Sequence, residues 1–202
     1  EDLEIARGFW QKAVELDSNF VSAMIKLAKT YQFTNEYDMA LEINNKALKK
    51  SIKQKDRINE AYALNGIGTV YMYRDGDLEK VQEYFEKGAA IANETGDKIL
   101  QSFFLNNLSI VFSYKGDKDK ALKMMEEMLV IVEDLNDKNG QMFAHNNIGT
   151  IYNDKGELEI WLDHAKRSLS LAKEIGDKNG ECYARVNIGS YHTKKEEYDI
   201  GL

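Results

Sequence analysis

The apolar positions of this chain fall at α-helical spacing, and the same apolar stripe returns about every 40 residues. In each copy, four residues lie at positions i, i+3, i+4 and i+7, which places them on one face of a helix. The third residue of each stripe is small, so a neighbouring helix can approach closely at that point. The copies are Met24, Leu27, Ala28 and Tyr31; Leu64, Ile67, Gly68 and Tyr71; Leu105, Leu108, Ser109 and Phe112; and His145, Ile148, Gly149 and Tyr152.

A second helix follows each stripe after a short turn. Its inner face lies at i, i+4 and i+7, as in Ala40, Asn44 and Ala47 of one repeat and Ala121, Met125 and Met128 of another. Glycine recurs in the turns, where a left-handed residue often ends a helix, and aspartate occupies positions that suit an N-cap. The glycines in or beside the turns are Gly76, Gly96, Gly116, Gly140, Gly156, Gly176 and Gly180, and the aspartates are Asp77, Asp97, Asp117, Asp137 and Asp177. The pattern therefore predicts pairs of antiparallel helices and no strands.

Repeats of this length stack into a solenoid, because one helix pair cannot bury its apolar face alone. We predict an all-α fold: a right-handed α-solenoid of stacked antiparallel helix pairs, with about five repeats and partial repeats at both ends. It forms one domain, 1-202, with about eleven helical segments, the last a truncated second helix over 196–202. The predicted repeats are 1–19 (partial), 20–55, 56–96, 97–136, 137–176 and 177–202 (partial). Since the pattern starts and stops inside repeats, we expect the chain to be a fragment of a larger protein.

Composition narrows the class of protein. The chain has 43% hydrophobic and 30% charged residues, as in a soluble globular protein. Its net charge of −7 argues against nucleic acid, which needs a basic face. No apolar run approaches the length of a membrane span. Cys182 is the only cysteine, so no internal disulfide can form, and we expect a reducing compartment, the cytoplasm.

The helix pairs resemble tetratricopeptide repeats, in which the first helix carries a large-x-x-large-small-x-x-aromatic stripe. Near the N-terminus, Ala6 and Ala13 precede Ala40 and Ala47 by 34 residues, the length of the standard repeat. Beyond that point the spacing becomes 41, 40 and 40. This longer form is similar to the repeats of Pins-type polarity adaptors, and to those beside bacterial adenylate cyclases, sensor kinases and transcription regulators. The resemblance implies a binding role, but the family is functionally diverse.

Each first helix has another face that is not used against its partner helix, and in a stacked solenoid these faces line the concave surface. An asparagine there offers both a donor and an acceptor, which match an extended peptide backbone. Related solenoids use such an asparagine ladder. The candidate peptide-binding groove has an aromatic row, Tyr62, Phe103, Phe143 and Tyr183 with Tyr73 and Tyr114, and an amide row, Asn107, Asn147 and Asn187 with Asn65, Asn106 and Asn146.

A structural role for the same residues stays open. An asparagine before Ile-Gly can bond a neighbouring helix instead of a ligand. An aromatic residue at the start of a first helix can likewise pack against the preceding repeat. The sequence does not decide between these interpretations.

The sequence shows no catalytic or metal-binding arrangement. The three histidines lack ligand spacing, and we expect His145 and His192 to be buried between helices. Gly66 and Gly68 lack the third glycine and the preceding strand of a dinucleotide-binding loop. Cys182 has no convincing base partner. We therefore expect no enzyme activity, no metal and no cofactor.

The sequence thus predicts a non-catalytic protein–protein interaction module that binds an extended peptide or partner segment in its groove. The alternative is a regulatory or sensor domain of a multidomain bacterial signalling protein, whose cyclase, kinase or transcription-regulating output domain lies outside this chain. Binding of a small molecule in the groove also stays open. The expected partner is a protein or peptide, and neither nucleic acid nor a membrane. Exposed apolar residues at the two ends, such as Ile5, Phe9 and Tyr198, predict weak end-to-end self-association.

Overall fold

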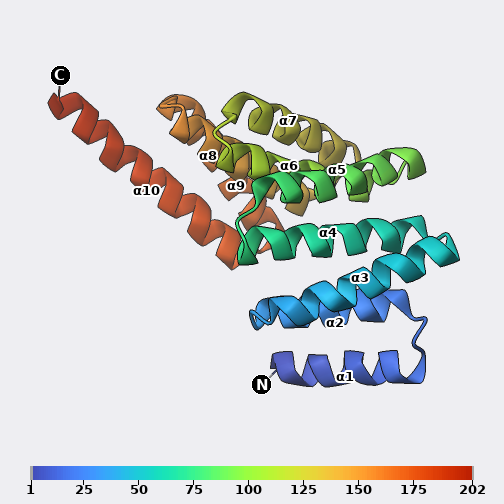
Figure 1. Cartoon of the computed structure of the whole chain (residues 1–202). Helices are drawn as coiled ribbons and strands as arrows, with labels where there is room; N and C mark the ends of the chain where they lie inside the picture. Colours follow the sequence, from blue (N-terminus) through green and yellow to red (C-terminus); the bar gives the residue numbers. More distant parts are fainter. Residues whose placement is uncertain (1, 202) are drawn as a thin grey trace. The chain divides into compact units, whose positions relative to one another are not determined.

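The computed structural model describes residues 2–201, with the side chains of residues 2–196. Every regular element in these residues is an α-helix, which confirms the predicted all-α fold (Figure 1). The helices are α1 (Asp2–Leu16), α2 (Val21–Phe33), α3 (Tyr37–Gln54), α4 (Arg57–Arg74), α5 (Leu78–Thr95), α6 (Lys98–Tyr114), α7 (Lys118–Asp134), α8 (Lys138–Asp154), α9 (Leu158–Ile175) and α10 (Lys178–Gly201). Helices α2, α4, α6, α8 and α10 are the predicted first helices of the repeats.

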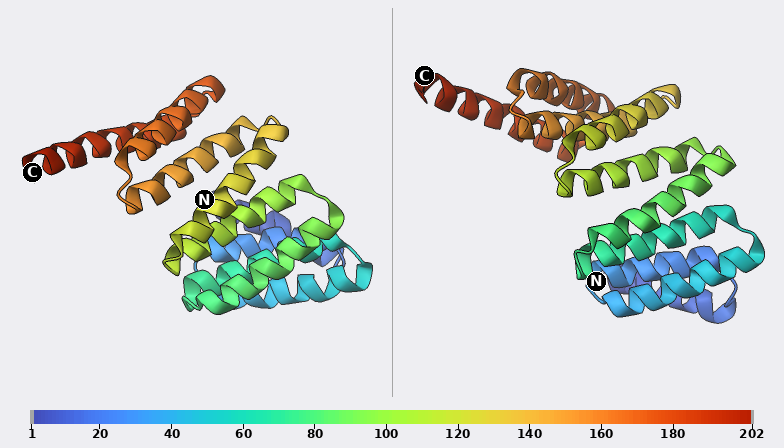
Figure 2. Two further views of the ribbon diagram at one scale, coloured as in Figure 1. Left: turned by 90° about the horizontal axis from the view of Figure 1, so that it is seen from above. Right: turned by 45° about the horizontal axis from the view of Figure 1, so that its top comes forward.

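The chain divides into two compact units, residues 1–104 and 105–202, and each is described by itself. In the first unit, α1 packs on α2, α2 on α3, α3 on α4 and α4 on α5, and the first helices α2 and α4 also contact each other. In the second unit, α7 packs on α8, α8 on α9 and α9 on α10. The order of helices within each unit can be followed in Figure 2. Packing between successive helices is the arrangement expected of an α-solenoid.

The predicted stripes supply the core of each unit. In the first unit, Leu27 and Tyr31 of α2 are buried with Val70 of α4. In the second unit, Met125 of α7 is buried with Ile148 of α8. Burying an apolar side chain of this size contributes about 1.5–3 kcal/mol, so these contacts are a main source of stability.

The small residue of each stripe lies where two helices come close. An ideal Cβ on Gly68 would lie 2.6 Å from Cε1 of Phe85, and one on Gly149 would lie 3.2 Å from Cδ1 of Trp161. In the intervening repeat, the hydroxyl of Ser109 donates to the carbonyl oxygen of Ala121 at 3.0 Å. A larger side chain at these positions would separate the helices of the pair.

The turns have the predicted left-handed residues and caps. The side chains of Asp77, Asp117 and Asp137 accept hydrogen bonds from backbone N–H groups three residues further on, and so cap α5, α7 and α8. Five of the predicted turn glycines have positive φ, whereas Gly140 and Gly180 lie in the first turns of α8 and α10 and do not; non-glycine residues take this conformation in three other turns. The glycines are Gly76, Gly96, Gly116, Gly156 and Gly176, and the others are Asn35, Lys55 and Asn136.

The end of the chain differs from the prediction. A turn followed by a truncated second helix was expected at 196–202, but α10 runs without interruption from Lys178 to Gly201. The reason is local. Glu196 occupies the position that carries Gly116 and Gly156 in the preceding repeats, and a residue with a Cβ is disfavoured in the left-handed conformation that ends those helices. Without that residue the helix continues.

His192 is also placed differently from the prediction, since it is exposed and not buried between helices. The second helix that would cover its stripe is the one that α10 replaces by continuing. Tyr198, which the prediction of end-to-end association used, lies outside the described side chains. Ile5 and Phe9, at the other end, are exposed as that prediction requires, so the association itself stays a prediction.

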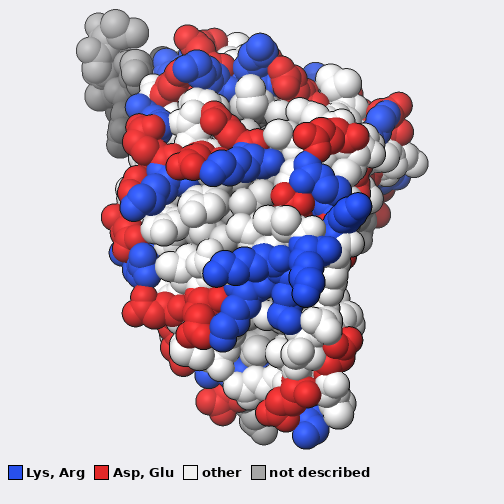
Figure 3. Space-filling view, turned by 45° about the vertical axis from the view of Figure 1, so that its right-hand side comes forward, with Lys and Arg blue, Asp and Glu red and all other residues white. Residues whose placement is uncertain are grey.

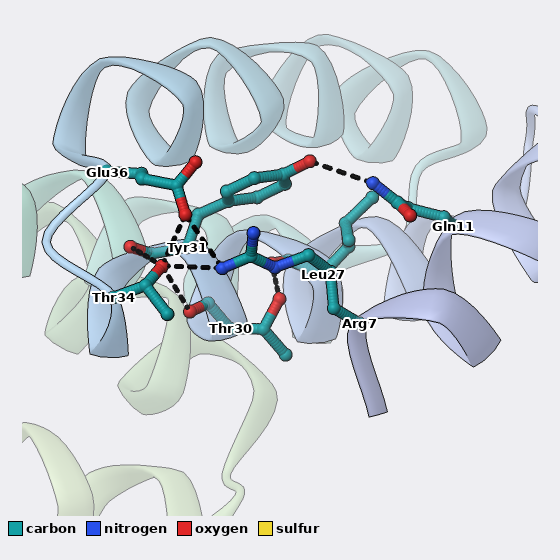
Figure 4. Close-up of polar contacts among 7 residues, drawn as sticks. All are labelled: Arg7, Gln11, Leu27, Thr30, Tyr31, Thr34 and Glu36. Carbon is teal, nitrogen blue, oxygen red and sulfur yellow. Dashed lines mark hydrogen bonds and ion pairs between the residues drawn. The ribbon is translucent and has the colours of Figure 1, made fainter. Parts of the chain in front are cut away.

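A cluster of polar side chains connects α1 to the end of α2 (Figure 4). The guanidinium of Arg7 lies 4.6 Å from the centroid of the Tyr31 ring, and donates at 2.7 Å both to the Thr34 hydroxyl and to the Glu36 carboxylate. A hydrogen bond from the Thr34 hydroxyl, together with Arg7, holds the pKa of Glu36 below its usual value. Gln11 adds a bond to the Tyr31 hydroxyl at 2.9 Å. These contacts fix α1 against the hairpin that follows it.

Candidate functional site

The asparagines of the second unit bond one another between successive first helices. Asn147 of α8 donates from Nδ2 to Oδ1 of Asn106 on α6 at 3.1 Å. Asn187 of α10 makes the same bond to Asn146 of α8 at 2.8 Å. Asn106 also donates to its neighbour Asn107 at 3.2 Å. We call these five residues the asparagine ladder.

The ladder therefore has a structural role, because it connects α6 to α8 and α8 to α10. A net contribution of about 0.5–1.5 kcal/mol is typical of such a bond. A role in binding is compatible with this arrangement. A side-chain amide can donate two hydrogen bonds and accept two, and the ladder residues are only half-buried. Asn147 and Asn187 use one donor each in the bonds that connect the helices.

Exposed aromatic rings lie beside the ladder. Phe143 precedes Asn147 by four residues on α8, and Tyr183 precedes Asn187 by four on α10, so each ring shares a helix face with its asparagine. The side chains of Phe143 and Tyr183 are 56% and 69% exposed, and Tyr114 at the end of α6 is also exposed. An exposed ring next to a half-buried amide is a surface suited to a ligand with apolar and polar groups.

Val186 belongs to the same surface, and sequence reasoning missed it. It occupies the position of Asn146 one repeat later and is exposed. The 40-residue period places position 186 on this face, but only aromatic and amide residues were considered as candidates there. Its exposure extends the apolar part of this face on α10.

In the first unit, the aromatic rings are closer together. Tyr62 of α4 and Phe103 at the start of α6 have ring centroids 6.2 Å apart with the ring planes at 56°. Phe103 is half-buried, and Tyr62 is at the limit of exposure. Tyr73, near the end of α4, is exposed, and Asn65 is half-buried. The contact between Tyr62 and Phe103 fits the structural interpretation of these two aromatics better than it fits a free binding surface.

Gly66 breaks the amide row of the first unit. Its carbonyl oxygen accepts a hydrogen bond from Nε2 of Gln32 at 2.8 Å. Asn44 of α3 fills the space at its Cα, so that a Cβ on Gly66 would lie 2.4 Å from Asn44 Oδ1. The amide of Asn44 is buried and has no hydrogen-bond partner among the described residues. Sequence reasoning placed Asn44 on the inner face of its helix but did not expect this contact.

Two histidines form a pair between α8 and α9, with His145 buried and His164 half-buried. Nδ1 of His145 lies 3.0 Å from Nδ1 of His164, and the ring of Tyr152 stacks on His164 at 5.9 Å. Burial lowers the pKa of His145 to about 4, and it also lowers the pKa of His164. His145 is buried as predicted, whereas its partner was not foreseen, because the two are 19 residues apart. The pair connects the helices in the neutral form.

Within the described residues, no three or more histidine, cysteine, aspartate or glutamate side chains gather as a metal site would require. Cys182 is exposed and free. No helix among those described combines the length and apolar character needed to cross a membrane.

Comparisons with known proteins agree with the geometry. Residues 58–133 match the family model described as tetratricopeptide repeat. No curated protein matches the chain. Among solved structures, BtubC (BKLC) from P. vanneervenii has a TM-score of 0.81 at 16% identity, with 98% of this chain and 83% of that chain covered.

Two further structures contain this fold within longer chains. Aspartyl phosphate phosphatase F from Bacillus subtilis has a TM-score of 0.80 at 13% identity, covering 90% of this chain and 47% of that one. A signal transduction ATPase with a tetratricopeptide repeat sensor from Pyrococcus horikoshii has a TM-score of 0.82 at 19% identity, covering 94% of this chain and 29% of that one. Identities this low establish the fold alone. With the family match over residues 58–133, the chain contains tetratricopeptide repeats, and the fold shared with these structures extends over nearly its whole length.

Proposed function

We propose that this protein is a non-catalytic interaction module that binds an extended segment of a partner protein along the first-helix face of its second unit. The observation that carries this proposal is the pairing of exposed rings with half-buried amides on α8 and α10, Phe143 with Asn147 and Tyr183 with Asn187. A fold that needed these residues only for packing would bury the rings. The proposed location of the protein is the cytoplasm.

The chemistry of the face suits an extended peptide. Its backbone presents N–H and C=O groups along both edges, and an asparagine can bond either. Successive first helices are joined directly by asparagine side chains, so they lie about 8–10 Å apart, as packed helices do. An extended chain rises about 3.3 Å per residue, so about three residues reach from one first helix to the next. Each net hydrogen bond contributes about 0.5–1.5 kcal/mol, so most of the affinity would come from burying the rings.

A selection experiment tests this function. Peptides are selected from a random-sequence phage library on the whole chain, and the affinity of a labelled winner is measured by fluorescence anisotropy. The groove variant is Phe143→Ser with Tyr183→Ser, whose exposed side chains can be replaced without a core defect. The matched control is Val130→Ser with Leu135→Ser, which removes two exposed apolar side chains at and beyond the end of α7.

We expect the groove variant to weaken binding at least about tenfold, equivalent to about 1.4 kcal/mol, and the control to bind like wild type. The proposal fails if no peptide is selected, or if the control loses binding and the groove variant does not. A thermal-shift screen of metabolites runs in parallel. Stabilisation by a metabolite, without any bound peptide, would assign the face to a small molecule.

A second function is favoured by one comparison. The Pyrococcus horikoshii protein carries its repeats as the sensor of a much longer chain, of which this chain covers 29%. By analogy, this protein would be the sensor region of a multidomain signalling protein such as a cyclase, kinase or transcription regulator. Sequencing the complete reading frame decides this alternative, since an output domain must be encoded beside these repeats.

A further inference from the structure

The second half of α3 and the turn after it form a basic surface on an acidic protein. From position 46 to position 57 six residues are basic and only Asp56 is acidic, whereas the whole chain has a net charge of −7. Figure 3 shows basic side chains gathered on this side of the molecule, with few acidic ones between them. The six residues are Lys46, Lys49, Lys50, Lys53, Lys55 and Arg57.

Most of this charge is not neutralised by the protein itself. Lys46 and Arg57 are paired with carboxylates, and Lys50 donates to the neutral side-chain amide of Asn19. The other three are exposed and have no acidic partner among the residues that the structure describes; they are Lys49, Lys53 and Lys55. Favourable interaction with the helix dipole explains a basic residue at the end of a helix. It is not a requirement of this fold, because α5 and α7 have no basic residue in their last turns.

An apolar side chain lies within the basic surface. Ile52 is 54% exposed, and it is three residues after Lys49 and one before Lys53. We call Lys46, Lys49, Ile52 and Lys53 the basic face of α3. A surface of lysines around one exposed isoleucine fits a partner that carries carboxylates around an apolar residue.

Two repeats later, α7 presents that combination. Glu126, Glu127 and Glu133 are exposed, and Val130 between them is 65% exposed. Glu127 lies 3.9 Å from Lys123 one turn before it, whereas Glu126 and Glu133 have no basic partner among the described residues. We call these four residues the acidic face of α7. Glu127 occupies the position that Lys46 has on α3, so the same helix face has changed its charge from one repeat to another. Carboxylates near the C-terminal end of a helix are disfavoured by its dipole, and Glu133 lies in the last turn of α7, which has no basic residue.

We propose that the basic face of α3 docks on the acidic face of α7 of a second copy of this chain. Lys46, Lys49 and Lys53 lie at i, i+3 and i+7 of α3, so they share one helix face. Glu126, Val130 and Glu133 lie at i, i+4 and i+7 of α7, with Glu127 beside them, so two helices lying side by side can set lysines against glutamates. Ile52 and Val130 then form the apolar centre of the contact. The basic face and the acidic face are both present on this chain, so a second copy can supply the complementary surface.

The other basic helix, α9, fits this role less well. Lys166 and Lys173 are exposed on its outer face, but Arg167 is paired with Asp163, and Glu174 follows Lys173 directly. Its charges therefore balance over a short distance. The second half of α3 carries no such acids before Asp56.

The proposed contact is heterologous, because each copy contributes a different face. The resulting dimer still has one free basic face on one copy and one free acidic face on the other, so association continues into longer chains or closes into a ring. The contact rests on exposed charges and is therefore screened by salt. It does not involve the asparagine ladder or the aromatic row, so it is independent of the proposed peptide-binding face.

Sedimentation velocity of the whole chain tests the proposal over a range of protein concentrations. We expect the mean mass to rise with concentration in about 0.01 M salt and to return to the monomer value in about 1 M salt, where the Debye length falls from about 30 Å to about 3 Å. Lys49→Glu with Lys53→Glu changes the basic face, and Glu126→Lys with Glu133→Lys changes the acidic face. Each variant alone should remain a monomer at low salt, since its two faces carry the same sign.

A mixture of the α3 variant and the α7 variant gives the decisive test. An equimolar mixture should associate again, because the acidic α3 of one variant meets the basic α7 of the other. The matched control, Lys166→Glu with Lys173→Glu, makes the same change in net charge on α9 and should associate like wild type. A far-UV spectrum like that of wild type for each variant excludes unfolding as the cause of lost association.

Three results would overturn the proposal. One is a wild-type chain that stays a monomer at low salt and high concentration. Another is a mixture of variants that fails to associate. The third comes from a flotation assay with vesicles of phosphatidylcholine and phosphatidylserine: if wild type stays a monomer but binds these vesicles, and the α3 variant does not, the basic face is a membrane-binding surface.

Discussion

The Cα of Gly66 lies directly against the side-chain amide of Asn44, so that a Cβ at position 66 would be 2.4 Å from Asn44 Oδ1. Asn44 is only 1% exposed, so its short side chain has little room to move away. The first helices of later repeats carry an asparagine at the position of Gly66, as at Asn147. In the first unit the amide belongs to Asn44 on α3, the second helix of its pair. Gly66 on α4 has no side chain, so it leaves room for this amide.

Replacing Gly66 by alanine should destabilise the protein. Alanine in the interior of a helix ordinarily stabilises it by about 0.5–1 kcal/mol relative to glycine. Here the added methyl group would overlap the Asn44 amide, at a cost of about 1–3 kcal/mol. We therefore expect a lower free energy of unfolding in urea for Gly66→Ala than for wild type.

Two variants control this result. Gly189→Ala changes a glycine in α10 that has no atom within 4 Å of the new Cβ, and it should not be destabilising. Adding Asn44→Ala to Gly66→Ala should restore much of the lost stability, because it removes both the overlap and a buried amide without a partner. If Gly66→Ala is as stable as wild type, the contact with Asn44 is not rigid.

The bond between Asn147 and Asn106 can be measured by a double-mutant cycle. Each single alanine variant loses the bond but gains helix propensity, so its net effect on stability is small. The coupling energy between the two sites should be about 0.5–1.5 kcal/mol. The matched control pairs Asn147→Ala with Asn45→Ala, since the Asn45 amide donates to the Leu41 carbonyl in its own helix. That control cycle should show no coupling.

The ladder should also contribute to binding if the proposed function is right. Replacing Asn107, Asn147 and Asn187 together by alanine should weaken the selected peptide about a hundredfold, at about 1 kcal/mol for each bond. Circular dichroism of the same variant should show unchanged helix content. Wild-type affinity in the triple variant would contradict a binding role for the amides, and would leave them as connectors between helices.

Gly149→Leu tests how closely α8 and α9 pack. A Cβ there would be 3.2 Å from Trp161 Cδ1 and 3.3 Å from the Cβ of His164, so a methyl group is tight and a leucine side chain does not fit. We expect a loss of at least about 1–3 kcal/mol in the free energy of unfolding. Gly189→Leu, in open space on α10, is the matched control. A melting temperature equal to that of wild type would show that the pair of helices separates at little cost.

The helix pairs were predictable because their signals are local and repeated. Stripes at helical spacing placed the first helices, and the glycines and capping aspartates placed most of the turns. The same reasoning failed at position 196. The 40-residue period predicted a turn at this position. Glu196 replaces the glycine that such a turn requires, and α10 continues through it.

The site was less predictable, because it depends on contacts between residues that are far apart in the chain. Position alone put the ladder asparagines on one face, but only the structure shows Asn147 bonded to Asn106, and Asn187 to Asn146, across helices. The contact of Asn44 with Gly66 joins two different helices, as does that of His145 with His164. No periodic pattern encodes such pairs, since each occurs once.

The histidine pair should make stability depend on pH. The folded protein holds the pKa of His145 near 4, mainly through burial and then through the charge of His164 and Arg167, while Asp163 acts in the opposite direction. In the unfolded chain a histidine has a pKa of about 6.5. Between these values the unfolded state binds more protons, so the free energy of unfolding rises with pH from about 4 to about 6.5. Below pH 6.5 this part of the stability is lost progressively.

The size of the effect follows from the shift. Each pKa unit corresponds to about 1.4 kcal/mol, so His145 alone accounts for up to about 3 kcal/mol between pH 7 and pH 4. His145→Gln should flatten the pH dependence of unfolding in urea by that amount, whatever its effect on stability at pH 7. His192→Gln, at an exposed histidine, is the control for the loss of one imidazole. Equal slopes in wild type and His145→Gln would mean that His145 titrates normally, and that the bond between Nδ1 of His145 and Nδ1 of His164 does not persist in solution.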